Sequence, residues 1–194
     1  MNYLGHAYLS FEQTPILVGN MVSDFVKGRA RFDFPEDIQK GIMLHREIDN
    51  FTDFHPAVKE AKLVFKADYG LYSGPLVDVI FDHYLALDAE SFPPQQLLPF
   101  TQSVYRQLDS QQAHLPERFA FMFTYMKAEN WLHGYANRSG IERSLRGLVR
   151  RSRYMSESET AFRLFNSHYT LLQQLASAFL PDVKSFAKDA LNAR

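Results

Sequence analysis

Apolar residues recur along this chain at steps of three and four, the spacing that places them on one face of an α-helix. Strict alternation of apolar and polar residues, which would indicate strands, is almost absent. We therefore expect helices and no sheet. The ranges that follow the helical pattern are 37–51, 57–69, 75–87, 97–111, 116–137, 140–153 and 156–179.

Proline and glycine mark the ends of several of these ranges. Pro35, Pro56 and Pro75 suit the first turn of a helix, and Gly70 suits a helix end. Pro181 is predicted to begin a short terminal helix, whereas residues 1–10 are either a first helix or an extended lead-in. No repeat or linker interrupts the pattern. The prediction is one all-α domain over residues 1–194, a bundle of roughly eight helices.

Composition narrows the classes of function. The chain has no cysteine, which excludes disulfides, thiolate zinc sites and a cysteine nucleophile. Its net charge of −1 does not indicate a nucleic-acid-binding protein. No apolar stretch is long enough to span a bilayer, and no targeting segment precedes the first helical range, so we expect a cytoplasmic protein that does not bind membranes.

Polar residues interrupt the apolar stripes at a few positions, and burying such groups is costly unless they are paired or bind a metal. His45 and Asp49 are one helical turn apart and share a stripe with Ile38 and Ile42. They could chelate one cation, or they could form a hydrogen-bonded pair in the core. The spacing alone leaves both alternatives open.

The range 75–87 carries a second set. Asp82 and His83 are adjacent in a helix that is otherwise apolar nearly all round and is therefore expected to be buried. We predict a ligand role for both, whereas Asp78, one turn earlier, is more typical of a structural residue. Together with His45 and Asp49, these residues indicate one shared polar site that a divalent cation would satisfy.

Two further residues are weaker candidates. Asp24 follows an apolar run and is either a ligand or a solvated acid in a last turn, where it opposes the helix dipole. His6 lies among apolar neighbours and, taken alone, is more typical of a core histidine than of a ligand. A set rich in carboxylates favours manganese or magnesium, although imidazole also suits iron and zinc.

Basic residues gather in two places. Six arginines occur between positions 138 and 153 against a single acid, Glu142, and Lys27, Arg29 and Arg31 follow Asp24. These charges are either solvated helix faces or surfaces that steer an acidic partner.

Several short motifs occur in order along the first half of the chain: Gly19-Asn20, Asp24-Phe25-Val26-Lys27-Gly28, Gly41-Ile42, His45-Arg46, Ile48-Asp49, Thr52-Asp53 and Asp82-His83-Tyr84-Leu85. Together they resemble the acyl carrier protein phosphodiesterase family. That family is similar to the all-helical HD-domain metal phosphohydrolases, although Asp82-His83 reverses the dipeptide that names them.

The resemblance implies hydrolysis of 4′-phosphopantetheine from the serine of holo-acyl carrier protein, with Mn²⁺ or another divalent cation such as Mg²⁺ lowering the pKa of a bound water. We expect Asp24, Asp49 and Arg46 to act in catalysis, with Asp49 orienting His45 or serving as a base and Arg46 contacting the phosphate. The expected metal ligands are Asp24, His45, Asp82 and His83, with His6 as a fifth. The expected docking residues for the acidic carrier protein are Lys27, Arg29, Arg146 and Arg150.

Two alternatives remain at this point. The same metal site could act on a nucleotide or another small phosphoester, or the chain could be a helical module that binds acyl carrier protein without turnover. The chain has no Glu-x-x-His pair of the di-iron type, no Gly-x-Ser-x-Gly elbow and no phosphate-binding P-loop.

Overall fold

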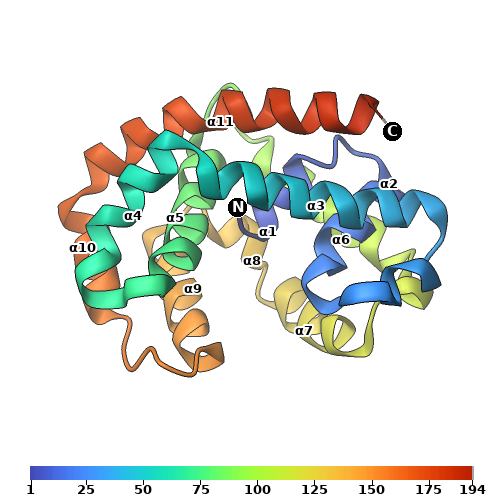
Figure 1. Cartoon of the computed structure of the whole chain (residues 1–194), viewed down its shortest axis with the longest axis horizontal. Coiled ribbons are helices and arrows are strands. Elements are labelled where there is room, and N and C mark those ends of the chain that lie inside the picture. The colour runs from blue at the N-terminus through green and yellow to red at the C-terminus, as the bar shows by residue number, and fades with distance from the viewer. Residues whose placement is uncertain (194) are drawn as a thin grey trace.

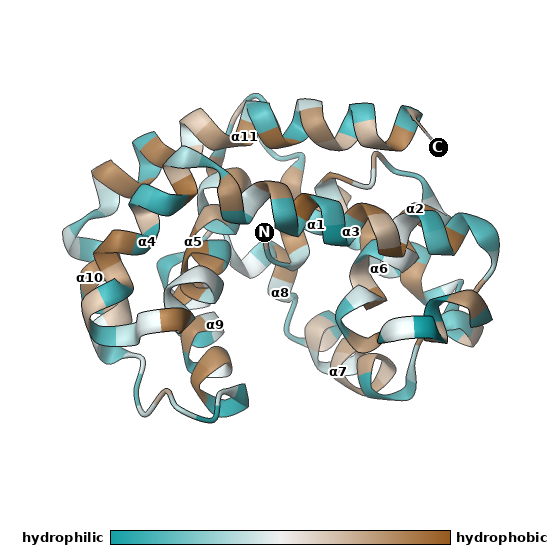
Figure 2. Ribbon diagram, in the orientation of Figure 1, coloured by the Kyte–Doolittle hydropathy of each residue, from teal (hydrophilic) through white to brown (hydrophobic). Residues whose placement is uncertain are grey.

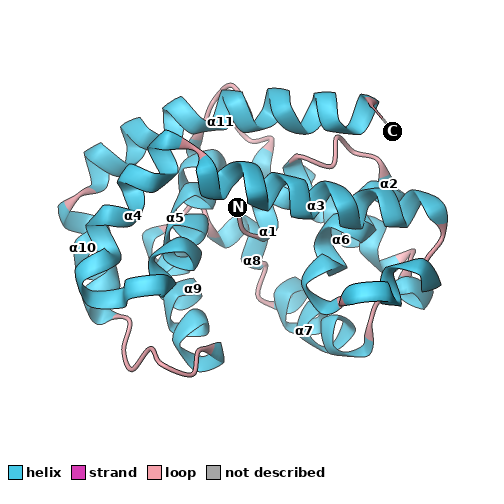
Figure 3. Ribbon diagram, in the orientation of Figure 1, coloured by secondary structure: helices cyan, strands magenta, loops and turns pink. Residues whose placement is uncertain are grey.

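The computed structural model describes residues 1–193, which form α-helices joined by short turns, with no strand among them (Figure 3). The predicted all-α fold is confirmed. Four short 3₁₀ helices join the α-helices: η1 (Ser23–Phe25), η2 (Gly28–Asp33), η3 (Gly70–Tyr72) and η4 (Gln112–His114). The α-helices are α1 (Tyr3–Tyr8), α2 (Thr14–Val22), α3 (Glu36–Phe54), α4 (Pro56–Tyr69), α5 (Ser73–Leu87), α6 (Leu97–Asp109), α7 (Glu117–Ala128), α8 (Trp131–Gly134), α9 (Arg138–Arg151), α10 (Glu159–Ser167) and α11 (Tyr169–Asn192).

The helices form an arch. In Figure 1, α3 and α11 run across the top, and two lobes hang below them. One lobe contains α4, α5, α9 and α10, and the other contains α6 and α7, with α1 and α8 between the lobes. The arrangement leaves α7 and α9 facing each other from opposite sides of the molecule's centre.

Close contact between α2 and α3 sets the position of the central helix. A Cβ atom at Gly19 would overlap the Ile38 carbonyl oxygen, and one at Gly41 would overlap the Ile16 carbonyl oxygen. Glycine at these two positions therefore lets the two backbones touch. Because α3 carries His45 and Asp49, this contact also determines where those side chains lie.

The core fills the space between the helices. In α5, eleven of the fifteen residues are buried, Asp82 and His83 among them, as expected for a helix that is apolar nearly all round. In α11, the buried residues recur at helical spacing, and Figure 2 shows hydrophobic and hydrophilic residues alternating along it. This helix therefore covers one side of the core and exposes its other face.

The structure divides the later helical ranges differently from the prediction. Residues 116–137 form two helices because Asn130 adopts a left-handed conformation, with φ of 49°, between α7 and α8. The range 156–179 also divides, at His168 between α10 and α11. Pro181 does not begin a new helix but lies inside α11, where the buried Phe179 and Val183 hold the same helix face against the core on either side of it.

Within the described residues, no helix combines the length and the apolar character needed to cross a bilayer.

We predict that Gly41→Ala lowers the free energy of unfolding by about 3 kcal/mol, because the added methyl group forces α2 and α3 apart. Gly74→Ala is the matched control, since its Cβ would meet only the Lys62 side chain, at 3.5 Å. Urea denaturation followed by circular dichroism measures both variants. Equal stabilities would contradict the close helix contact.

Candidate metal centre

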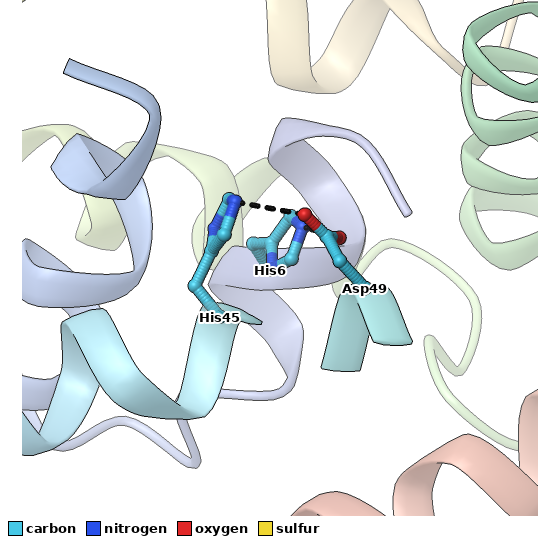
Figure 4. Close-up of side chains that lie close together, drawn as sticks. All are labelled: His6, His45 and Asp49. Carbon is cyan, nitrogen blue, oxygen red and sulfur yellow. Dashed lines mark ion pairs between the residues drawn. The ribbon is translucent and has the colours of Figure 1, made fainter. Parts of the chain in front are cut away.

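Three side chains from two distant parts of the chain lie close together. His6 comes from α1, and His45 and Asp49 come from α3. One ligand atom from each lies within 4.8 Å of the other two. Figure 4 shows the three side chains close together. The two imidazole rings stack, with centroids 3.9 Å apart and planes 15° from parallel. The predicted pairing of His45 with Asp49 is present, and His6 joins it.

Asn20 orients both rings. Its backbone carbonyl oxygen lies 2.7 Å from His45 Nδ1, so that nitrogen must carry the proton and donate it. Its side-chain amide donates to the His6 carbonyl oxygen and to Ser10 Oγ, which turns Oδ1 towards His6 Nδ1 at 2.8 Å. His6 Nδ1 is therefore also the donor, and the Nε2 atom of each ring faces the centre of the cluster, where it offers a lone pair whenever the ring is neutral.

The Nε2 atoms of both histidines face the Asp49 carboxylate at the centre of the cluster. His6 Nε2 lies 3.1 Å from Asp49 Oδ1, and His45 Nε2 lies 3.1 Å from Asp49 Oδ2. Both Nε2 atoms are buried, and neither makes an aligned hydrogen bond. Burial lowers the pKa of His6 to about 4, and the charge of His45 adds to this effect, so His6 stays neutral near pH 7. Asp49 and the two Nε2 atoms thus surround one point, where a proton carried by His45, or a divalent cation that displaces it, balances the carboxylate charge.

The two histidines differ in charge at neutral pH, because His6 is neutral and His45 is protonated. Burial alone would lower the pKa of His45, but its contacts with Asp24 and Asp49 outweigh this and raise the pKa to about 9. Asp24 Oδ1 lies 3.3 Å from His45 Nε2, and this contact lowers the pKa of Asp24. Burial opposes ionisation of Asp49, yet its contacts with both imidazoles hold its pKa below the usual range. Both carboxylates are therefore ionised at neutral pH, as cation ligands must be.

A cleft of about 1,060 Å³ adjoins the cluster. Its walls come from α7 and α9, which face each other in Figure 1, and its floor includes His6, His45, Asp49 and Asp24. Arg118 on α7, with Arg150 and Arg151 on α9, lines the walls. The cleft thus combines a candidate cation site with guanidinium groups, the donors that suit phosphate oxygens.

The structure gives Asp82 a different partner set. Its Oδ1 accepts a hydrogen bond from the Asn2 backbone N–H at 3.1 Å, and its Oδ2 accepts from Leu4 and Gly5 at 2.8 and 3.2 Å. Burial raises the pKa of Asp82 to about 7, a rise that the N-terminal ammonium and these donors limit. Asp82 lies outside the three-residue cluster and anchors the first turn of the chain, which carries His6.

His83 is also engaged elsewhere. Its Nδ1 lies 2.6 Å from the Tyr135 carbonyl oxygen, and its Nε2 lies 2.8 Å from the Tyr169 hydroxyl. Both nitrogens thus have partners among core residues. We leave Asp82 and His83 out of the ligand set proposed below, because their polar atoms are already satisfied by hydrogen bonds.

The other predicted residues divide between the cleft and the surface. Arg46 donates to the Val26 carbonyl oxygen at 2.9 Å and so fastens the segment that follows Asp24. Lys27 and Arg29 are exposed beside that segment. On α9, Arg146 pairs with Glu142 at 2.6 Å, whereas Arg150 lines the cleft.

Sequence reasoning assigned no role to Asn20. The available signal was a polar residue inside the apolar run of α2, where an amide is costly to bury without partners. It also gave no partner to Asp78, whose Oδ1 lies 2.9 Å from the Met1 amino group. The amino group lies 4.0 Å from Asp49 as well, which places positive charge beside the cluster.

Comparisons with known proteins identify the family of the chain. A family model described as "Acyl carrier protein phosphodiesterase" matches residues 1–183. The chain belongs to the acyl carrier protein phosphodiesterase family. The match covers every residue of the cluster and both walls of the cleft.

Curated relatives carry the same description. A Yersinia pestis protein named "Acyl carrier protein phosphodiesterase" is 36% identical over 182 residues, which cover 93% of this chain and 94% of the relative. Relatives of the same name from Yersinia enterocolitica and Photorhabdus laumondii are 34% and 31% identical over 190 and 182 residues, covering 97% and 93% of this chain and 98% and 92% of their own lengths. No solved structure matches the chain.

The role of Asp82 as an anchor leads to a test. We predict that Asp82→Ala lowers the free energy of unfolding by about 3 kcal/mol, because three backbone N–H groups lose their acceptor. The folded variant retains Mn²⁺ binding, whereas Asp49→Asn loses most of it with a much smaller change in stability. Urea denaturation and titration calorimetry measure the two properties. An Asp82→Ala protein of normal stability that binds no Mn²⁺ would make Asp82 a ligand instead.

His83 predicts a pH effect on stability. Burial lowers its pKa below that of the unfolded chain, about 6.5, and Arg138 adds to this effect. Its contribution is therefore complete above about pH 6.5 and is lost as the pH falls towards the lower folded-state pKa. His83→Gln can keep both hydrogen bonds without titrating, so its free energy of unfolding should fall less than that of the wild type between pH 7 and pH 5. Identical slopes would contradict a neutral His83.

Proposed function

We propose that this chain is a metal-dependent phosphodiesterase that hydrolyses 4′-phosphopantetheine from the serine of holo-acyl carrier protein. The observation that carries the proposal is the convergence of two buried imidazole Nε2 atoms on an ionised carboxylate at the floor of an arginine-lined cleft. Family membership supports the substrate, because the relatives are named for it.

The proposed ligands are His6, His45 and Asp49, with Asp24 beside them at the cleft floor. Two imidazoles with carboxylates form a donor set that suits Mn²⁺, and also iron or zinc. A divalent cation held there would neutralise phosphoryl oxygens and lower the pKa of a bound water. The hydrogen bonds from both rings to Asn20 keep the rings turned for this purpose, as outer partners of metal-binding histidines commonly do.

In this proposal, Asp24 acts as the acceptor that orients the attacking water in the cleft. Its side chain is 68% exposed, unlike those of the two histidines, and its carboxylate is ionised at neutral pH. A carboxylate at the edge of the site can accept a hydrogen bond from the attacking water and direct its lone pair at phosphorus. Asp49, by contrast, contacts both imidazoles and is committed to the cluster.

The arginines of the cleft supply the remaining charge. Arg118 approaches from α7, and Arg150 and Arg151 approach from α9, so a phosphodiester between the walls would lie among guanidinium groups. Such groups stabilise charge that grows on phosphoryl oxygens during hydrolysis. This role replaces the one expected of Arg46, whose guanidinium holds Val26.

We propose that the acidic carrier protein docks across the mouth of the cleft. Lys27 and Arg29 lie in the segment that precedes α3, and Arg146 and Arg150 lie on α9, which Figure 1 places in the opposite lobe. Positive charge on both sides would steer an acidic partner and orient its serine over the floor.

Mass spectrometry of the carrier protein tests the proposed function. Incubation with holo-acyl carrier protein and Mn²⁺ should remove the phosphopantetheine mass, and EDTA should abolish the reaction. His6→Gln and Asp49→Asn should each lower the rate by more than about 100-fold, whereas Asn20→Ala should weaken metal binding by about 10- to 100-fold.

Asp53→Asn is the control, because Asp53 pairs with Lys62 on the surface and lies outside the cluster. An unchanged carrier mass with Mn²⁺ bound at the site would refute the proposed substrate and direct attention to small phosphoesters. Activity that survives both His6→Gln and Asp49→Asn would refute the proposed site.

A further inference from the structure

A second cavity adjoins the cleft. It has a volume of about 570 Å³ and lies between α8, α9 and the segment of residues 156–159. This volume falls within the roughly 300–1,000 Å³ of pockets that hold drug-sized ligands. Asn2, Tyr3, Gly147 and Arg151 line both the cavity and the cleft, so the two spaces meet beside the floor of the proposed site.

Gly147 lies at this junction, although no neighbouring atom comes close enough to require a glycine there. A Cβ atom built there would meet nothing within 4 Å. Gly140, on the same helix, differs, since a Cβ there would overlap the Gly134 carbonyl oxygen. A glycine inside a helix costs about 0.5–1 kcal/mol relative to alanine. At position 147 the helix bears this cost while the space beside it stays open.

The walls of the cavity are amphipathic. Aromatic surface comes from Tyr3, Trp131 and the buried Tyr135, and Ser144 adds a hydroxyl on α9. Two of the nearby carboxylates are already engaged, because Glu129 accepts from Trp131 Nε1 at 3.0 Å and Glu157 accepts from the Tyr69 hydroxyl at 3.0 Å. Arg143, Arg146 and Arg150 also line the cavity, so its walls combine aromatic surface with hydrogen-bond donors. Such a lining suits a flexible chain that carries both amide carbonyl groups and aliphatic carbons.

Only one end of the proposed substrate can enter. A phosphodiester at the floor of the cleft joins a folded carrier protein to a narrow pantetheine arm, and the protein must remain outside. We infer that the cavity between α8 and α9 binds the pantetheine arm during hydrolysis, and that Gly147 keeps the passage to it open. This inference rests on the proposed function, because it takes the arm as the group attached to the phosphate.

Arg151 stands at the same junction. It lines both spaces, and its charge reaches the hydroxyls of Tyr3 and Tyr135, whose pKa values it lowers against the larger effect of burial. A phosphate at the entrance would therefore meet a guanidinium while the arm passes between the aromatic side chains.

A comparison of two substrates tests the inference. Holo-acyl carrier protein has the arm, and bis(p-nitrophenyl) phosphate is a phosphodiester without it. Gly147→Leu should lower the ratio of the rate on the carrier to the rate on the small diester by about tenfold or more, because the arm is displaced from its path. Ser139→Leu is the control, since it adds the same side chain to an exposed position of α9 that lines neither space, and its ratio should match that of the wild type.

Val149→Phe provides a second test if Gly147→Leu folds poorly, because Val149 lines the cavity but not the cleft. An unchanged ratio in a folded variant at either position would overturn the inference. If wild-type protein leaves the carrier intact, the proposed function fails separately. Calorimetric titration with free 4′-phosphopantetheine then decides: binding that Gly147→Leu abolishes supports the arm site, and absence of binding to the wild type overturns it.

Discussion

Two hydrogen bonds to one residue determine the chemistry of the site. The backbone oxygen of Asn20 accepts from His45, and its side-chain oxygen accepts from His6, so both Nε2 atoms point at Asp49. The bond from His45 depends in turn on how closely α2 approaches α3, since Asn20 belongs to one helix and His45 to the other. Without the backbone contact at Gly19, the carbonyl of Asn20 and the imidazole would not meet.

The first turn of the chain is held by tertiary contacts. Helix α1 has six residues, too few for a helix to be stable alone in water. Three backbone N–H groups of this segment bind the carboxylate of Asp82, and the Met1 amino group pairs with Asp78. Both acids come from α5, a helix with eleven of its fifteen residues buried. These contacts attach α1 to α5 and so fix the position of His6, which contributes one of the two imidazoles.

The helices could be predicted from the sequence where apolar residues recur regularly at helical spacing. The stripe of Ile38, Ile42 and His45 identified α3 because packing on one face repeats at helical spacing. The break at Asn130 could not be foreseen, since a left-handed residue there depends on how α7 and α8 pack. Pro181 was equally ambiguous: proline permits a helix start, and only the burial of its neighbours carries α11 through it.

For the site, the residue pattern identified which side chains would be costly to bury and showed that His45 and Asp49 share a helix face. It could not determine how each group is satisfied. A buried carboxylate can be stabilised by backbone N–H groups, as at Asp82, or by imidazoles and a cation, as proposed at Asp49. Only the tertiary structure decides between these outcomes, because the partners come from segments far apart in the chain. His6, unremarkable among its sequence neighbours, joins the cluster for the same reason.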